Sequence, residues 1–115
     1  GYLSTALAEV KRILKPGGVV GIVQHMAPES ASDTWADGNK GYLKKSFVIE
    51  TMTAAGFELI GESNINVNPK DQPTESDFVW RLPPVFASSG DDAEKRAQYQ
   101  AIGESSRMTL LFRKP

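Results

Sequence analysis

A helix stop that runs directly into an apolar strand is the feature that most constrains this sequence. Over residues 2–15, apolar side chains recur at spacings of three and four, which predicts an amphipathic helix. Its apolar stripe consists of Leu3, Ala6, Leu7, Val10, Ile13 and Leu14. Pro16, Gly17 and Gly18 end this helix, because proline cannot continue it and glycine readily takes the left-handed cap. Residues 19–23 follow at once, and their β-branched, apolar character predicts a strand buried on both faces, as in parallel sheets.

The rest of the chain continues the alternation of helix and strand. Gln24 and His25 follow the first strand, and the polar residues 26–41 predict a long loop. A second helix is predicted over residues 42–55, with Gly56 as its C-terminal cap. Its inward stripe consists of Leu43, Phe47, Val48, Thr51, Met52 and Ala55. Further patterns predict strands at 57–60, 63–67 and 108–112, a turn at 88–92, a helix at 93–102, and a proline-interrupted irregular segment at 68–86.

This order of elements predicts a single α/β domain over residues 1–115. Taken by itself it amounts to an α+β fragment, with a small three-stranded mixed sheet and two main helices. Two architectures fit that description: a partial Rossmann-like sandwich and a winged-helix-like unit.

Composition excludes several classes of site and partner. Fourteen acidic against thirteen basic residues give a net charge of −1, which disfavours binding to nucleic acid or to an anionic membrane. The chain has no cysteine and one histidine, so disulfides, thiolate ligands and sites with two imidazoles are excluded. No apolar run approaches the ~20 residues of a membrane span. We therefore expect a cytoplasmic protein without a metal site or a membrane segment.

His25 is the candidate catalytic residue. Ligands of open α/β sheets bind at the carboxyl ends of strands, where a histidine could act as a general base. A hydrogen-bonding loop residue is the simpler interpretation. Glu29, Asp33 and Asp37 in the following loop match no metal-ligand spacing and fit solvated acids better. Ser105 has no recognisable base partner, so nucleophilic catalysis by this residue is not expected.

Two further groups of residues could form binding surfaces. They are Lys40, Lys44 and Lys45, at the expected start of the second helix, and Trp80, Arg81 and Phe86, in the proline-rich segment. A helix N-terminus would add to the attraction of the lysines for the phosphates of a nucleic acid. An ordinary solvated face is the simpler interpretation of the lysines, and the net charge favours it. The aromatic group fits a recognition surface or a satellite core equally well.

The sequence also resembles a known family. Residues 7–18, Leu-Ala-Glu-Val-Lys-Arg-Ile-Leu-Lys-Pro-Gly-Gly, with the apolar strand after them, resemble the part of class I S-adenosylmethionine-dependent methyltransferases that leads into strand five. Residues 55–57 match the run into strand six, and residues 108–115 resemble the last strand, which is antiparallel and lies between strands five and six. Residues 103–110 with 81–84 resemble a bacterial group of predicted methyltransferases. This resemblance implies that Arg81, Glu104 and Arg107 are substrate-side residues.

The resemblance covers only the carboxyl half of the family's domain. The family holds S-adenosylmethionine through a glycine-rich turn after strand one and an acid at the end of strand two, and this sequence contains neither. No cofactor-binding residue can therefore be named. We expect a methyltransferase-like fragment that binds no cofactor by itself and is not catalytic alone, which leaves open whether the chain is an enzyme. The alternative is a small binding module that contacts nucleic acid or a protein.

The missing half would also leave a strand edge unpaired. In the intact fold, the strand at 19–23 pairs with strand four, which has no counterpart in this sequence. An unpaired apolar edge is a site of association. We therefore expect a homodimer, or binding to the missing N-terminal half of the domain.

Overall fold

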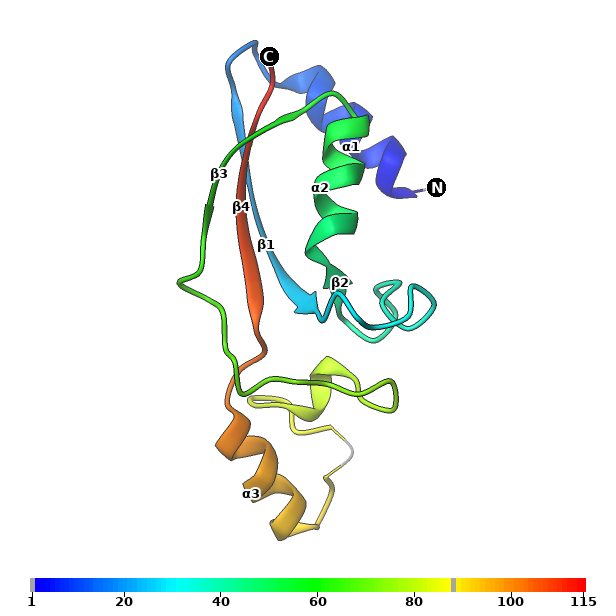
Figure 1. Ribbon diagram of the computed structural model, residues 1–115, viewed down its shortest axis with the longest axis vertical. Helices are drawn as coiled ribbons and strands as arrows, with labels where there is room; N and C mark the ends of the chain where they lie inside the picture. Colours follow the sequence, from blue (N-terminus) through cyan, green and yellow to red (C-terminus); the bar gives the residue numbers. More distant parts are fainter. Residues whose placement is uncertain (1, 88) are drawn as a thin grey trace.

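The computed structural model describes residues 2–87 and 89–115, with side chains from residue 5 onward. Within this part of the chain, the helices are α1 (Tyr2–Ile13), α2 (Lys45–Ala54) and α3 (Ala93–Ile102), the strands are β1 (Val19–Ala27), β2 (Leu43–Lys44), β3 (Glu58–Ser63) and β4 (Arg107–Arg113), and η1 (Val79–Arg81) is a 3₁₀ turn. The molecule is elongated, measuring 51 × 28 × 24 Å. Figure 1 shows α1 and α2 beside the sheet, and η1 and α3 beyond one end of it.

The described strands form one mixed sheet in the order β2-β1-β4-β3. β4 runs antiparallel to both of its neighbours, with Val19 opposite Arg113 on one side and Glu58 opposite the same arginine on the other. This confirms the position that the resemblance implied for the last strand. The two-residue β2, which the sequence did not predict, pairs in parallel with the end of β1 and adds a fourth strand. The mixed α/β class is confirmed.

The C-terminal residues hold the turn that follows α1. The N–H of Gly17 donates to the carbonyl of Lys114 over 2.7 Å. The Lys114 ammonium donates to the carbonyls of Lys11 and Leu14 over 2.6 and 2.7 Å. Carbonyls at a helix C-terminus lack intrahelical partners, so a lysine here satisfies them. α1 is confirmed, although Ile13, placed in the buried stripe by its spacing, is exposed.

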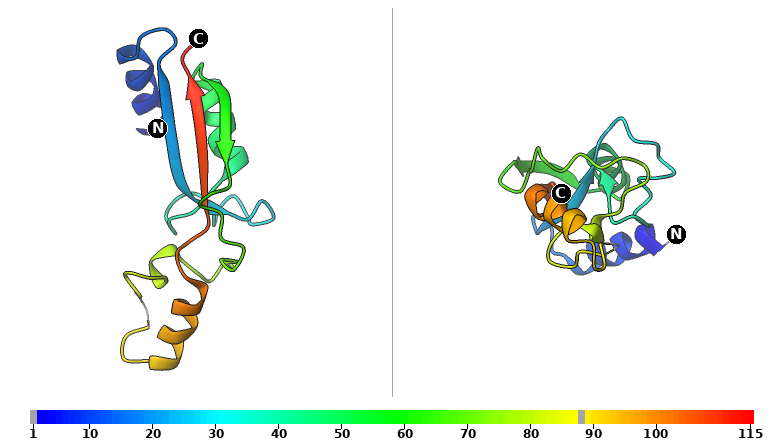
Figure 2. Two further views of the ribbon diagram at one scale, coloured as in Figure 1. Left: turned by 90° about the vertical axis from the view of Figure 1, so that its left-hand side faces the viewer. Right: turned by 90° about the horizontal axis from the view of Figure 1, so that it is seen from below.

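Both main helices cover the same face of the sheet: α1 and α2 lie on the same side of the strands in Figure 1, and the opposite face is turned to the viewer in the left view of Figure 2. The core between the helices and this face consists of Leu7, Val48, Met52, Phe57, Met108, Leu110 and Phe112. β1 therefore alternates: Val20 and Ile22 pack on the core, whereas Val19 and Val23 are 53% and 56% exposed. The prediction that this strand is buried on both faces is wrong, because the described residues supply a helical layer to one face only.

The second helix begins three residues later than predicted. Tyr42 is fully buried ahead of it, and Leu43–Lys44 pairs with β1 instead. The start is set by Glu29, whose carboxylate accepts hydrogen bonds from the N–H and the hydroxyl of Ser46 over 3.2 and 2.6 Å. A carboxylate satisfies the free N–H groups of a first turn and complements the helix dipole. Phe47, expected to face inward, is 43% exposed.

The remaining elements follow the predicted order. β3 covers parts of the two predicted strands at 57–60 and 63–67 and joins them. α3 is confirmed over 93–102, and the Asp92 side chain caps it by accepting a hydrogen bond from the N–H of Lys95. Of the predicted turn at 88–92, Ser88 lies outside the described residues. No helix within residues 2–87 and 89–115 is both long and apolar enough to cross a membrane.

Substitutions of two neighbouring leucines of β4 test whether the core lies on only one face of the sheet. Leu110 is 2% exposed and faces the helices, whereas Leu111 is 38% exposed on the opposite face. We expect Leu110→Ala to lower the free energy of unfolding by about 2–5 kcal/mol, through lost burial and a residual cavity. Leu111→Ala should cost under about 1 kcal/mol. Urea denaturation of both variants measures the difference, and equal losses would contradict the one-sided core.

Candidate functional site

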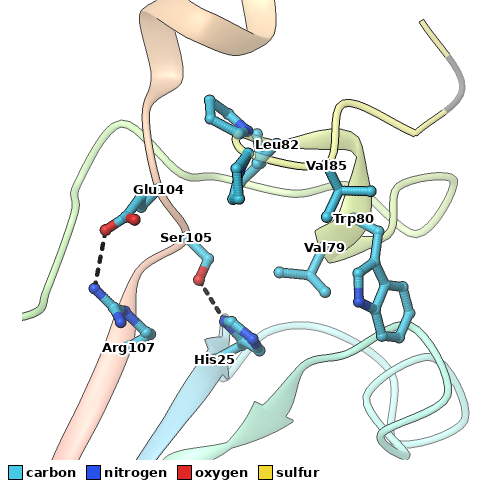
Figure 3. A pocket seen from close by; sticks show the side chains of 10 residues that line it. His25, Val79, Trp80, Leu82, Val85, Glu104, Ser105 and Arg107 are labelled. Carbon is cyan, nitrogen blue, oxygen red and sulfur yellow. Dashed lines mark hydrogen bonds and ion pairs between the residues drawn. The ribbon is translucent and has the colours of Figure 1, made fainter. Parts of the chain in front are cut away.

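A cavity of about 240 Å³ opens at the end of the sheet where β1 and β4 meet the irregular segment. We call it the His25 pocket. Its apolar wall comes from η1 and the residues after it, including Val79, Trp80 and Val85. Its polar wall consists of His25, Glu104, Ser105 and Arg107. Figure 3 shows the two walls facing each other.

The polar wall contains a hydrogen bond between side chains that are far apart in sequence. His25 Nδ1 lies 2.5 Å from the Ser105 hydroxyl. The antiparallel register brings them together, because His25 pairs with Arg107 and Ser105 precedes that residue by two positions. The expectation that Ser105 lacks a base partner is therefore wrong. His25 Nε2 makes no hydrogen bond to any described residue.

The surroundings of His25 favour its neutral form. Burial lowers the pKa of its imidazole, and the positive charge of Arg107 lowers it further. The Asp71 carboxylate opposes this shift of the pKa. The imidazole and the Tyr42 ring form a T-shaped pair, with ring centroids 6.4 Å apart. A neutral imidazole with one free nitrogen can accept a proton, which is what a general base needs.

A buried polar network stands behind the polar wall. The Asp71 carboxylate accepts hydrogen bonds from the Tyr42 hydroxyl at 2.8 Å, from Arg81 Nη2 at 3.0 Å, and from the N–H of Ser106 at 3.0 Å. Arg81 Nη1 also donates to the Tyr42 hydroxyl. Burial raises the pKa of that hydroxyl, so Tyr42 stays protonated. Every member of this network has a partner, which a buried ion pair requires.

A second group of hydrogen bonds fixes the residues just before β4. The Asn68 side-chain amide donates to the carbonyls of Ile102 and Glu104, both over 2.7 Å. The N–H of Asn68 donates to the Ser106 hydroxyl over 3.0 Å. The backbone of 102–106 is thus held from both ends. Ser105 lies within this stretch and is itself buried.

The substrate-side residues implied by the resemblance occupy different environments. Glu104 and Arg107 line the pocket and form an ion pair at 3.2 Å. Arg107 Nε is buried without a hydrogen-bond partner among the described residues. Arg81 is buried in the Asp71 network and does not line the pocket. The Arg96 guanidinium lies over the Phe86 ring, with its Cζ 4.1 Å from the ring centroid.

The lysine cluster is partly neutralised by acids. The Lys44 ammonium pairs with Asp33 at 2.8 Å, and Lys45 pairs with Glu62 at 3.5 Å. Lys40 is exposed. The other loop acids are likewise engaged: Glu29 caps α2, and Asp37 accepts hydrogen bonds from Asn39. Among the described residues, no group of three or more His, Asp or Glu side chains is arranged to hold a metal ion.

Three of the described glycines, at the helix stop and before β2, do not form a cradle for S-adenosylmethionine. Gly17 and Gly18 lead from α1 into a strand, not from a strand into a helix. Gly41 has a φ of +90°, but a Cβ added there would lie 2.1 Å from Val79 Cγ1. The absent side chain at this position therefore makes room for Val79, not for a ligand. The described residues do not fit the cofactor.

Comparison with known proteins shows a similarity of fold to a solved structure. No protein-family model matches the chain, and no curated protein sequence matches it significantly. Among solved structures, the chain is similar to SpnF, a [4+2]-cyclase, with 22% identity and a TM-score of 0.55 over 97% of this chain. The chain spans 44% of the length of SpnF. Since SpnF has the fold of S-adenosylmethionine-dependent methyltransferases, the similarity supports a methyltransferase-like fold here, the first of the two expected architectures.

The Asp71 network can be tested against an exposed ion pair of the same kind. Asp71→Ala leaves Arg81 as an uncompensated buried charge, so we expect the free energy of unfolding to fall by about 3–5 kcal/mol. Glu58→Ala removes the partner of Arg113 in an arginine–carboxylate pair whose side chains are 51% and 45% exposed, and a change of under about 1 kcal/mol is expected. Thermal and urea unfolding of both variants provide the measurement. A small loss for Asp71→Ala would mean that the network does not hold the pocket.

Proposed function

We propose that this chain is the part of a methyltransferase-like domain that binds the methyl acceptor, in the His25 pocket. The observation that carries the proposal is the position of the pocket. It lies at the carboxyl end of β1, and open α/β sheets bind their ligands outside the carboxyl ends of strands. The fold resemblance and the sequence resemblance of residues 7–25 point to the same family of domains.

The size and walls of the pocket suit a small amphipathic acceptor. A volume of about 240 Å³ is below the roughly 300–1,000 Å³ usual for ligand cavities, which favours a molecule no larger than a single ring. Trp80 and Val85 offer an apolar surface to such a ring. His25, Ser105 and Arg107 offer a base, a hydroxyl and a cation to a polar group on it.

The assignment of methyl transfer as the reaction depends on the sequence resemblance to methyltransferases. SpnF is a cyclase, so its fold alone does not specify methyl transfer. The resemblance of residues 7–25 and 103–110 to methyltransferases supplies that assignment. In this proposal the methyl donor is held by polypeptide other than this chain, so the chain alone is not catalytic.

The bare face of the sheet is where that other polypeptide would pack. β1 pairs with β4 along residues 19–25, while its other edge pairs only at Met26 and Ala27. Val19, Val23 and Leu111 are exposed on the uncovered face. The occupant we propose is the remainder of a methyltransferase-like domain, because the similar cyclase has more than half of its chain beyond the matched part. A second copy of this chain is the competing occupant.

Nucleic-acid binding through Lys40, Lys44 and Lys45 is the less favoured alternative. Lys44 and Lys45 already pair with acids, and the net charge is −1. Phosphate contacts would give a steep dependence of duplex-DNA affinity on salt, and a flat or absent response counts against this alternative.

Titration calorimetry with S-adenosylmethionine tests whether the methyl donor is bound by polypeptide other than this chain. We expect no binding by the chain alone at micromolar concentrations, because the described residues offer no cofactor cradle. The matched titration uses a full-length methyltransferase of this fold, which must give a clear signal under the same conditions. Micromolar binding by the chain would overturn the proposed function.

The uncovered face is tested with an apolar dye and light scattering. In the isolated chain we expect the dye to bind at this face, and Val23→Lys to reduce its fluorescence without unfolding the protein, since Val23 is 56% exposed. Val20→Lys, on the core side of the same strand, should unfold it. A stable homodimer in light scattering would instead assign the face to a second copy, and a monomer that binds no dye would contradict an association site.

A further inference from the structure

The two nitrogens of the His25 imidazole have different surroundings. Nδ1 is joined to the Ser105 hydroxyl, and Nε2 has no hydrogen-bond partner among the described residues. The ring lines the pocket opposite the apolar wall (Figure 3). A nitrogen without a protein partner beside a cavity is available to a ligand.

We propose that His25 takes a proton, through Nε2, from the hydroxyl group of a small phenol-type compound bound between it and Trp80, with Ser105 as the positioning residue that selects the tautomer. This inference rests on the proposed function and names the class of acceptor. A phenol suits both walls, because its flat ring matches the Trp80 indole and its hydroxyl reaches the polar side.

Ser105 has a definite task in this arrangement. Nε2 is a base only when the proton of the neutral ring resides on Nδ1, and Nδ1–H then donates to the Ser105 oxygen. The Ser105 hydroxyl has no other hydrogen-bond partner among the described residues, so its own proton is free for the oxygen of the ligand. If Ser105 donated to Nδ1 instead, Nε2 would carry the proton and His25 would be a donor.

The proton step is balanced within the pocket. The O–H bond of the ligand breaks and its proton forms the Nε2–H bond, which leaves a phenolate oxygen beside an imidazolium. Arg107 lies opposite His25 in the strand register, and its buried Nε has no partner. Its positive charge favours the phenolate and disfavours the imidazolium. Asp71 favours the imidazolium, and Glu104 neutralises part of the arginine charge.

The single histidine makes the tautomer directly observable. With ¹⁵N-labelled histidine, the chain gives one imidazole spectrum. We expect the neutral ring to carry its proton on Nδ1 and to titrate below an exposed histidine. Ser105→Ala should shift the proton towards Nε2, and Ser105→Thr, which keeps the hydroxyl, should restore it. A wild-type ring with its proton on Nε2 would overturn the inference.

The ligand class is tested with 4-nitrophenol, whose ionisation is visible by absorbance, and with 4-nitroanisole, which lacks the proton. Both should shift the Trp80 indole N–H resonance, while that of Trp35, bonded to the Asp77 carbonyl, stays unmoved. Bound 4-nitrophenol should ionise about one pH unit below the free compound. His25→Gln should abolish this displacement and retain binding, and Ser105→Ala should reduce it.

The 4-nitrophenol experiment can fail independently of the S-adenosylmethionine titration that tests the proposed function. Absence of 4-nitrophenol binding would overturn the acceptor class, and binding with an ionisation that is insensitive to His25→Gln would overturn the role of the base. Binding of S-adenosylmethionine by the chain contradicts the proposed function alone, because none of these readouts uses the methyl donor.

Discussion

The buried carboxylate of Asp71 is the group on which the arrangement of the pocket depends. An ionised carboxylate removed from water must be paired and hydrogen-bonded throughout, or the fold does not tolerate it. Its partners belong to three segments: Tyr42 precedes β2, Arg81 ends η1, and Ser106 precedes β4. The first two segments also meet in a small apolar cluster that contains Tyr42 and Val79, to which the segment before β4 contributes no residue. The hydrogen bonds of Asp71 therefore connect segments that share little apolar contact. They fix the position of the polar wall of the pocket relative to the apolar wall.

Local patterns predicted the elements that local interactions stabilise. α1 follows from apolar periodicity and its stop signal, α3 from helix-forming composition after a capping turn, and β4 from alternation, so each appears where the sequence places it. The start of α2 could not be found this way, because Glu29 sets it from 17 residues upstream. β2 exists only because the end of β1 lies beside it.

The contacts within the site, like β2 and the start of α2, depend on residues that are distant in sequence. His25 was found as a polar residue at a strand end, but Asp71 lies among prolines with no periodicity and gave no signal. The pairing of His25 with Ser105 spans 80 residues. A signal for it did exist, since the resemblance placed the last strand antiparallel to the first. That placement brings residues near 105 to the carboxyl end of β1, and only the register was missing.

The pocket is lined on one side by residues of paired strands and on the other by residues of η1 and the irregular segment after it. His25 and Arg107 stand on paired strands, where side chains are held most rigidly. Trp80 and Val85 stand on η1 and the segment after it, which contribute no ladder hydrogen bonds to the sheet. We expect a substitution at Trp80 or Val85 to change the shape offered to a ring and to leave the imidazole in place, because neither side chain makes a hydrogen bond within the Asp71 network. In the proposed function, shape selection and proton transfer thus belong to separate parts of the chain, and the hydrogen bonds of the buried Asp71 carboxylate join these parts.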